Sequence, residues 1–217
     1  KIFIACDTTN LVKVKKIINQ SKTNKIKIGY KFGLEFMNSK NGRTFLAKLR
    51  KKIIFIDLKL NDTVNTMLSA VKALKDIKIN YLTVHISSGL AALKAVKKIS
   101  GPTRIVGVTT LTSLNNNDLK LIGYNKSVKN LVAHQAKLAK KANLDALVCS
   151  PYEVSAVRKI FKKEIITPGV QIGKKNYDQK RSMEAKKVNS DWLVIGRAIT
   201  ARGNIKKNIQ NLIEKLR

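Results

Sequence analysis

Eight short apolar segments recur along this 217-residue chain, and the stretches between them space their apolar residues as helices do. Near-continuous apolar strands joined by helices are typical of a parallel sheet that is buried on both faces. Eight such units favour a closed (β/α)8 TIM barrel over an open sheet. No linker divides the chain, so we expect a single domain over residues 1–217. The expected strands are Ile2–Ala5, Lys25–Gly29, Ile53–Ile56, Tyr81–Val84, Arg104–Val108, Ala146–Cys149, Glu164–Thr167 and Leu193–Ile195.

The helical spacing is clearest in Thr66–Leu74 and Val128–Ala142, where apolar residues recur every three or four positions. The longest polar interruption, Thr112–Lys126, predicts a loop with a short helix. Ser113 or Asn115 would cap that helix, because both side chains accept hydrogen bonds from backbone amides.

The formal net charge of +31 is the most unusual feature of the composition. A positive surface attracts nucleic-acid phosphates, but the lysines are scattered and no block of five like charges occurs. The sequence motifs of zinc fingers and RRM domains are also missing. We therefore interpret most of the charge as compositional drift towards lysine on solvated helix faces. Its remaining consequence is a positive field that favours capture of a small anionic substrate.

The sequence also carries information about the compartment. No apolar run reaches the ~18 residues that a membrane span needs, and we expect no signal peptide. Cys6 and Cys149 each end an apolar run and lack the spacing of metal ligands. We therefore expect two buried, reduced thiols in a cytoplasmic protein.

Polar residues directly follow most of the apolar segments. In a TIM barrel the active site is built at the carboxyl ends of the strands, and a purely structural barrel has no need for acids and lysines there. The polar residues at these positions are Asp7, Lys27, Asp57, Lys59, His85, Thr109–Ser113, Ser150, Thr167, Gly196 and Arg197.

The run Asp57–Asp62 has the pattern Asp-x-Lys-x-x-Asp. Because side chains alternate along a strand, Asp57 and Lys59 would lie on the same face. A strand-end salt bridge with Asp62 as a helix N-cap explains the pattern equally well. Lys27 favours a catalytic cluster, because it ends the neighbouring expected strand. There it would alternate in charge with Asp57 and Lys59 and hold them ionised.

Candidate phosphate-binding residues lie near the end of the chain. Loops after the seventh and eighth strands of such barrels bind phosphate through backbone amides and a helix N-terminus. Thr167–Val170 follows the seventh strand, and Gly196–Arg197 follows the eighth. Arginine can hold a phosphate with two hydrogen bonds. A turn glycine and a surface arginine would also explain these residues, but their position after the last two strands favours phosphate binding. For His85, a structural role and a catalytic role are equally compatible with the sequence.

Ten segments carry the chemistry-bearing residues: Ala5–Asp7, Lys27–Gly29, Phe55–Asp62, Asn65–Thr66, Val84–His85, Leu111–Ser113, Val148–Pro151, Thr167–Gly169, Asp178–Arg181 and Val194–Arg197. In this combination the chain resembles the orotidine 5′-phosphate decarboxylase family of the bacterial type, over essentially its whole length. The resemblance implies a TIM barrel of the ribulose-phosphate-binding type. It also implies conversion of orotidine 5′-monophosphate to uridine 5′-monophosphate and carbon dioxide, the last step of de novo UMP biosynthesis, with no metal and no cofactor.

The resemblance further implies a catalytic array of Lys27, Asp57, Lys59 and Asp62. In it, Lys59 would stabilise and protonate the carbanion that forms at C6 of the pyrimidine. The array would be shared in a homodimer, because Asp62 and Thr66 would reach into the active site of the neighbouring subunit.

The substrate contacts that the resemblance implies involve further residues. They are Asp7 at the ribose hydroxyls, Thr112 and Ser113 near the pyrimidine, Ser150 at the pyrimidine edge, and Gln179, Gly196 and Arg197 at the phosphate. The chain also departs from the bacterial pattern: Gln171 replaces the usual arginine, Asn61 replaces histidine, and Thr63–Val64 replaces Ile-Pro. The first departure removes one expected phosphate contact and gives Arg197 more weight.

Two alternatives remain open from the sequence. A magnesium-dependent sugar-phosphate decarboxylase or aldolase of the same barrel class shares the Asp-x-Lys-x-x-Asp pattern. It needs further acids for its metal, at positions where this chain has Ile56 and His85–Ser87. A degenerate barrel that binds nucleic acid or a membrane surface would explain the charge, but not the intact set of acids and lysines.

Overall fold

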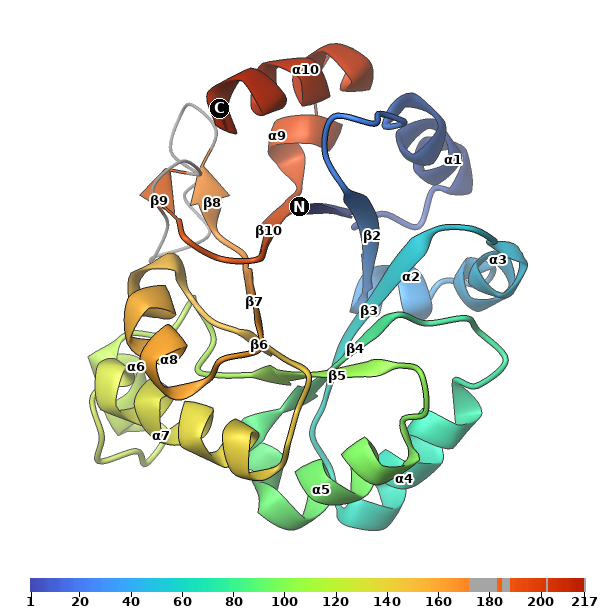
Figure 1. Ribbon diagram of the computed structural model, residues 1–217. Helices are drawn as coiled ribbons and strands as arrows, with labels where there is room; N and C mark the ends of the chain where they lie inside the picture. Colours follow the sequence, from blue (N-terminus) through green and yellow to red (C-terminus); the bar gives the residue numbers. More distant parts are fainter. Residues whose placement is uncertain (172–182, 185–187, 202, 217) are drawn as a thin grey trace.

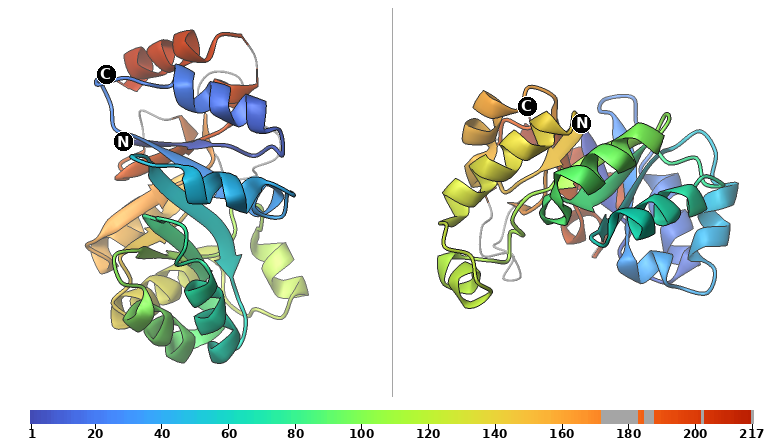
Figure 2. Two further views of the ribbon diagram at one scale, coloured as in Figure 1. Left: turned by 90° about the vertical axis from the view of Figure 1, so that its right-hand side faces the viewer. Right: turned by 90° about the horizontal axis from the view of Figure 1, so that it is seen from below.

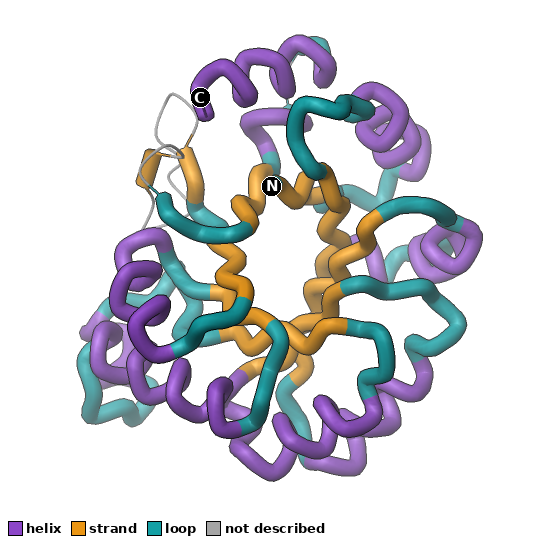
Figure 3. Tube along the Cα trace, in the orientation of Figure 1, coloured by secondary structure: helices purple, strands orange, loops and turns teal. Residues whose placement is uncertain are grey.

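The computed structural model describes residues 1–171, 183–184, 188–201 and 203–216. Eight parallel strands close into a barrel, in which each strand pairs with the next one along the chain and the last pairs with the first. Figures 1 and 3 show this ring of strands enclosed by helices, which confirms the expected TIM barrel. The strands are β1 (Ile2–Ala5), β2 (Ile28–Gly33), β3 (Ile53–Leu60), β4 (Tyr81–His85), β5 (Arg104–Val108), β6 (Ala146–Val148), β7 (Glu164–Thr167) and β10 (Trp192–Ile195).

Helices follow the strands because their apolar stripes cover the outer face of the sheet. In the longest of them, α7, Leu131, Val132, Ala136 and Ala139 are buried. The α-helices are α1 (Leu11–Gln20), α2 (Leu34–Met37), α3 (Gly42–Lys48), α4 (Val64–Ala73), α5 (Gly89–Ile99), α6 (Asn116–Leu121), α7 (Val128–Lys141), α8 (Val154–Ile160), α9 (Arg197–Thr200) and α10 (Ile205–Leu216). The 3-10 helices are η1 (Ile86–Ser88) and η2 (Pro151–Glu153). Among the residues described, no helix is both long and apolar enough to span a bilayer.

The polar interruption after β5 forms the short helix α6, which stands out from the barrel in both views of Figure 2. Asn115 caps it: its side chain accepts hydrogen bonds from the amides of Asn117 and Asp118, and the Asp118 carboxylate accepts from the Asn115 amide. This reciprocal capping box satisfies amides that the first turn would leave unpaired. Of the two expected caps, the structure therefore selects Asn115 over Ser113.

Aromatic rings fill the interior of the barrel. Phe3 stacks on Trp192 with ring centroids 4.1 Å apart, and its ring also packs against Phe55 and Tyr81. All four are buried, and burying a side chain of this size contributes roughly 1.5–3 kcal/mol. Gly29 makes room for them, because a Cβ at that position would lie 2.5 Å from the Phe3 ring.

The strand predicted at Lys25–Gly29 lies too early in the sequence. The observed strand β2 begins at Ile28 and runs to Gly33, and it pairs with β1 and β3 in that register. The reason is burial: Tyr30 and Phe32 supply the apolar side chains that pack under the helices, whereas Lys25 and Lys27 are exposed. β3 is also longer than predicted, and β8 (Val170–Gln171) and β9 (Met183–Glu184) form an additional two-stranded sheet.

Candidate active site

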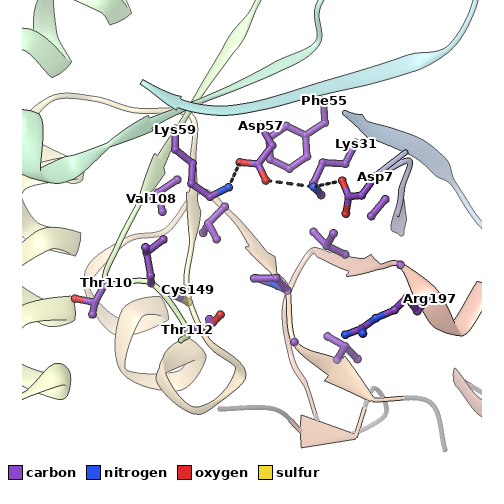
Figure 4. A pocket seen from close by; sticks show the side chains of 18 residues that line it. Asp7, Lys31, Phe55, Asp57, Lys59, Val108, Thr110, Thr112, Cys149 and Arg197 are labelled. Atoms are coloured by element: carbon purple, nitrogen blue, oxygen red, sulfur yellow. Dashed lines mark hydrogen bonds and ion pairs between the residues drawn. The ribbon is translucent and has the colours of Figure 1, made fainter. Parts of the chain in front are cut away.

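A cavity of about 340 Å³ opens at the carboxyl ends of the barrel strands. Four charged side chains, from β2, β3 and the segment after β1, lie along one side of it, and Arg197 lies across from them in Figure 4. The cavity is lined by Ala5, Asp7, Lys31, Phe55, Asp57, Lys59, Val108, Thr110, Leu111, Thr112, Val148, Cys149, Pro168, Gly169, Val170, Val194, Gly196 and Arg197.

The four charged side chains alternate in sign and form one continuous chain of ion pairs (Figure 4). Lys31 Nζ lies 3.1 Å from Asp7 Oδ1 and 3.4 Å from Asp57 Oδ2. The other oxygen of Asp57, Oδ1, lies 3.0 Å from Lys59 Nζ. Asp57 therefore sits between two ammonium groups and uses a different oxygen for each.

These contacts keep the central pair charged. Burial alone raises the pKa of Asp57, but the charges of Lys31 and Lys59 and hydrogen bonds from Lys59 and Thr83 outweigh it, so the pKa is lowered. Burial likewise lowers the pKa of Lys31, but the carboxylates of Asp57 and Asp7 reverse the effect and raise it. Both groups are therefore ionised at neutral pH although only 12–13% of each side chain is exposed.

Lys59 reaches Asp57 through an irregular backbone rather than by regular strand alternation. The pairing of β3 with β4 shifts in register between Ile56 and Leu60, and Lys59 has a φ of 50°. A positive φ is uncommon for a residue with a side chain, and it clusters at functional sites. The Lys59 amide donates to Thr83 Oγ1 at 2.8 Å. The same-face arrangement expected from the sequence thus arises at a bulge.

Residues that follow β7 and β10 also line the cavity. Pro168, Gly169 and Val170 follow β7, and Gly169 has a φ of 75°, which favours glycine. Gly196 and Arg197 follow β10, and Arg197 begins α9. This side therefore offers a cationic group to an anion.

Comparison with known proteins identifies the family of this chain. Residues 1–212 match the model of the "Orotidine 5'-phosphate decarboxylase / HUMPS family". The orotidine 5'-phosphate decarboxylase of Wolbachia sp. subsp. Brugia malayi is 39% identical over 224 residues, covering 99% of this chain and 97% of the relative. The chain belongs to the orotidine 5′-phosphate decarboxylase family. It is accordingly an enzyme that decarboxylates orotidine 5′-monophosphate to uridine 5′-monophosphate.

Solved structures of the decarboxylase family agree with this assignment. The crystal structure of the enzyme from Lactobacillus acidophilus is 27% identical, has a TM-score of 0.84, and covers 99% of this chain and 98% of its own. The enzyme from Methanocaldococcus jannaschii, solved in complex with inhibitor BMP, has a TM-score of 0.79 at 22% identity. It covers 100% of this chain and 98% of its own. At that identity, the second comparison supports the fold alone.

The structure brings a different lysine to Asp57 from the one expected, because Lys27 lies far from the cavity. Lys27 precedes β2, its carbonyl accepts from the Ile2 amide, and its exposed side chain lies at the amino end of the barrel. Lys31, four residues later, ends up between Asp7 and Asp57. The pattern Lys-x-Gly occurs at both positions, so only the burial of Tyr30 and Phe32 indicates which lysine reaches Asp57.

The loop after β5 brings one of its two predicted residues to the cavity. Thr112 lines it together with Thr110 and Leu111, whereas Ser113 is exposed and does not. Gln135 of α7 holds this loop, because its Oε1 accepts from the Thr110 amide at 2.8 Å.

Three other predicted residues lie outside the cavity lining. Ser150 is fully buried and does not line the cavity, and its Oγ accepts from the Tyr152 amide as the N-cap of η2. Asp62 and Thr66 are exposed on the loop and helix after β3. Asp62 Oδ1 accepts from the Thr63 amide at 2.7 Å, so the expected N-cap position is taken by Thr63 instead.

The remaining residues considered in the sequence either do not line the cavity or lie outside the described residues. His85 ends β4 without lining the cavity, and burial and the charge of Lys59 lower its pKa. Gln179 and the segment Asp178–Arg181 lie outside the described residues, as does the side chain of Gln171. Within the described part of the chain, no three His, Cys, Asp or Glu side chains gather as a metal site.

Proposed function

We propose that the Asp7–Lys31–Asp57–Lys59 array catalyses the decarboxylation, with Lys59 stabilising and then protonating C6 of the pyrimidine. The observation that carries this proposal is the position of Asp57. It holds Lys59 Nζ at 3.0 Å, and Lys59 lines the cavity with about a third of its side chain exposed. A fixed ammonium group is thereby available to a bound substrate.

The chemistry explains why such a group is needed. When the C6–carboxylate bond of orotidine 5′-monophosphate breaks, carbon dioxide leaves and its bonding electron pair stays on C6. That pair lies in the plane of the ring, so the π system cannot delocalise it. An ammonium group beside C6 stabilises the developing charge, and proton transfer from Lys59 to C6 then completes uridine 5′-monophosphate. Interactions that strengthen as charge develops accelerate the step selectively.

The proposed substrate orientation follows the distribution of charge around the cavity. Asp7 would accept hydrogen bonds from the ribose hydroxyls, and Thr112, which lines the cavity, would lie near the pyrimidine. Arg197 and the Gly196 backbone would hold the phosphate across from the lysines, with Gln179 as a further contact. Ser113 and Ser150 would approach the pyrimidine only if the loops after β5 and β6 move on binding.

We also propose a homodimer with shared active sites. Asp62 and Thr66 are exposed and remain outside the cavity of their own subunit, which leaves them available to a partner. The proposal is tested by mixing two inactive variants, Asp62→Ala and Lys59→Ala. Hybrid dimers contain one site with both native residues, so part of the parental activity should return. Hybrids that form, as shown by differential tagging, but stay inactive would exclude sharing.

The function is tested by following ultraviolet absorbance as purified protein acts on orotidine 5′-monophosphate in the presence of EDTA. We expect turnover in EDTA, because the proposed chemistry needs neither metal nor cofactor. Lys59→Ala should be folded by circular dichroism and inactive. Turnover that requires added Mg²⁺ would instead indicate the metal-dependent relatives, and near-parental turnover by Lys59→Ala would exclude the proposed role of Lys59. A cytoplasmic location is part of the same proposal and is checked by cell fractionation.

A further inference from the structure

Thr83 is a fully buried residue at the centre of β4, directly beneath the catalytic array. Its hydroxyl makes two hydrogen bonds to the neighbouring strand. Thr83 Oγ1 accepts from the backbone amide of Lys59 at 2.8 Å and donates to Asp57 Oδ1 at 3.1 Å. One side chain therefore contacts both residues of the ion pair that faces the cavity.

The strand register explains why a hydroxyl is needed at this point. β3 and β4 pair regularly at Ile56 with Leu82 and then at Leu60 with Val84. Four steps along β3 thus face two steps along β4, and the Lys59 amide lies in the part of β3 that has left the regular ladder. A buried backbone amide requires a partner, and the Thr83 oxygen provides one while Lys59 holds its positive φ.

The same hydroxyl also determines how Asp57 is oriented. A hydroxyl has one proton to donate, and here it goes to Oδ1, the oxygen that also contacts Lys59 Nζ. Oδ2 is left to face Lys31. Rotation of the carboxylate would break the Thr83 contact, so the hydroxyl fixes which oxygen meets which lysine.

We propose that Thr83 is a positioning residue for the decarboxylation, setting the Lys59 ammonium against Asp57 by fixing the Lys59 backbone and the Asp57 carboxylate together. This inference rests on the proposed role of Lys59. Thr83 does not line the cavity, so its effect is transmitted through Asp57 and Lys59. The ribose and phosphate contacts proposed above are on other strands and do not depend on it.

Thr83→Val tests the inference, because valine keeps the shape and removes both hydrogen bonds. We expect kcat to fall on the order of 10²-fold, as for a misplacement of about 1 Å, with KM changed far less. Thr83→Ser restores the hydroxyl and should recover most of kcat. Thr103→Val is the matched control, since Thr103 Oγ1 also bonds across strands, to the Ile79 carbonyl at the amino end of the barrel. It should leave kcat unchanged.

A second measurement separates positioning from general stability. The Thr83 hydrogen bond is one of the causes that lower the pKa of Asp57, so the acid limb of the kcat/KM profile should move to higher pH in Thr83→Val. A folded Thr83→Val with parental kcat, or a Thr83→Ser that is equally impaired, would overturn the inference.

A crystal structure of Thr83→Val gives a test that does not depend on activity. We expect Lys59 to leave its left-handed conformation or the Asp57 carboxylate to rotate, and an unchanged Lys59–Asp57 pair would overturn the inference. If Thr83→Val does not fold, Thr83→Ala replaces it in every measurement. A parental enzyme without decarboxylase activity, or an active Lys59→Ala, would instead refute the proposed function.

Discussion

The two ends of the barrel each hold a carboxylate at the centre of a polar network, and the two networks differ in what they face. At the carboxyl end, Asp57 lies between Lys31 and Lys59 and beside a cavity. At the amino end, Glu164 accepts hydrogen bonds from Tyr81, Arg104, Trp192 and Lys1. Both carboxyl groups have lowered pKa values.

The two networks differ in whether their cationic groups face a cavity. Glu164 Oε1 accepts from Lys1 and Trp192, while Oε2 accepts from Tyr81 and Arg104. These donors stand against the stacked rings that fill the barrel, and Lys1 and Arg104 also lie over the Trp192 and Tyr81 rings. The network around Glu164 therefore connects neighbouring segments at the amino end of the barrel. Asp57 instead holds Lys59 beside a cavity, so the two networks differ in access to open space and not in the number of their ion pairs.

The largest expected effect on kcat/KM comes from replacing Lys31, with Lys27, four residues earlier, as the control. We expect Lys31→Met to lower kcat/KM by about 10²–10³-fold, as removal of a preorganised charge does, because Asp57 and Asp7 both lose their shared partner. Lys27→Met is the matched control, and an exposed lysine should change kcat/KM less than about twofold. The measurement is steady-state decarboxylation. Equal effects of the two substitutions would refute the placement of Lys31 in the array.

The fold was predictable because burial and periodicity determine it. β1, β5 and β7 have the bounds read from their apolar segments, and β4, β6 and β10 each differ by one residue at one end. β3 begins where expected and runs four residues further, whereas β2 is displaced at both ends. The predicted bounds of β2 were wrong because Lys25–Gly29 alternates as a strand would, while the buried residues Tyr30 and Phe32 come later. A local pattern cannot show which of two overlapping segments will pair with its neighbours.

The site was only partly predictable, because several of its contacts depend on how neighbouring strands pair. Asp57 and Lys59 are only two residues apart in the sequence, so their ion pair could be inferred. The bulge and the Thr83 contact that hold it depend on the register of β4. Lys31 and Asp7 meet through the pairing of β1 with β2. Ser150 follows a strand as expected, yet it is fully buried and its hydroxyl caps η2 instead of lining the cavity.

A smaller effect, on stability alone, is expected at the amino end. Glu164→Gln keeps the size of the side chain but replaces one acceptor oxygen by an amide that faces donors. The free energy of unfolding should fall by about 1–3 kcal/mol, while kcat/KM stays at the parental value because Glu164 is on the opposite end from the cavity. Urea unfolding and steady-state kinetics measure the two quantities. A folded Glu164→Gln with reduced kcat would show that the two ends are coupled.

The smallest expected effect is on how the free energy of unfolding depends on pH. It tests whether a lowered carboxyl pKa distinguishes Asp57 from Glu164. Burial raises the pKa of Glu164, but hydrogen bonds from Tyr81, Trp192 and Lys1 and the charge of Arg104 outweigh it and lower the pKa. A carboxylate with a lowered pKa contributes stability above its unfolded value of about 4.3, and this contribution is lost as the pH falls through the folded value.

The difference in unfolding free energy between the parent and Glu164→Gln should therefore be largest near neutral pH and shrink as the pH falls below about 4. Asp57→Asn should show the same trend, because the pKa of Asp57 is lowered too. Urea unfolding at constant ionic strength between pH 3 and pH 7 measures both. A difference that stays constant for Glu164→Gln would mean that its hydrogen bonds do not favour the charged form. If both differences shrink alike, the lowered pKa marks only a carboxylate surrounded by donors, and the cavity beside Asp57 is what distinguishes the two ends.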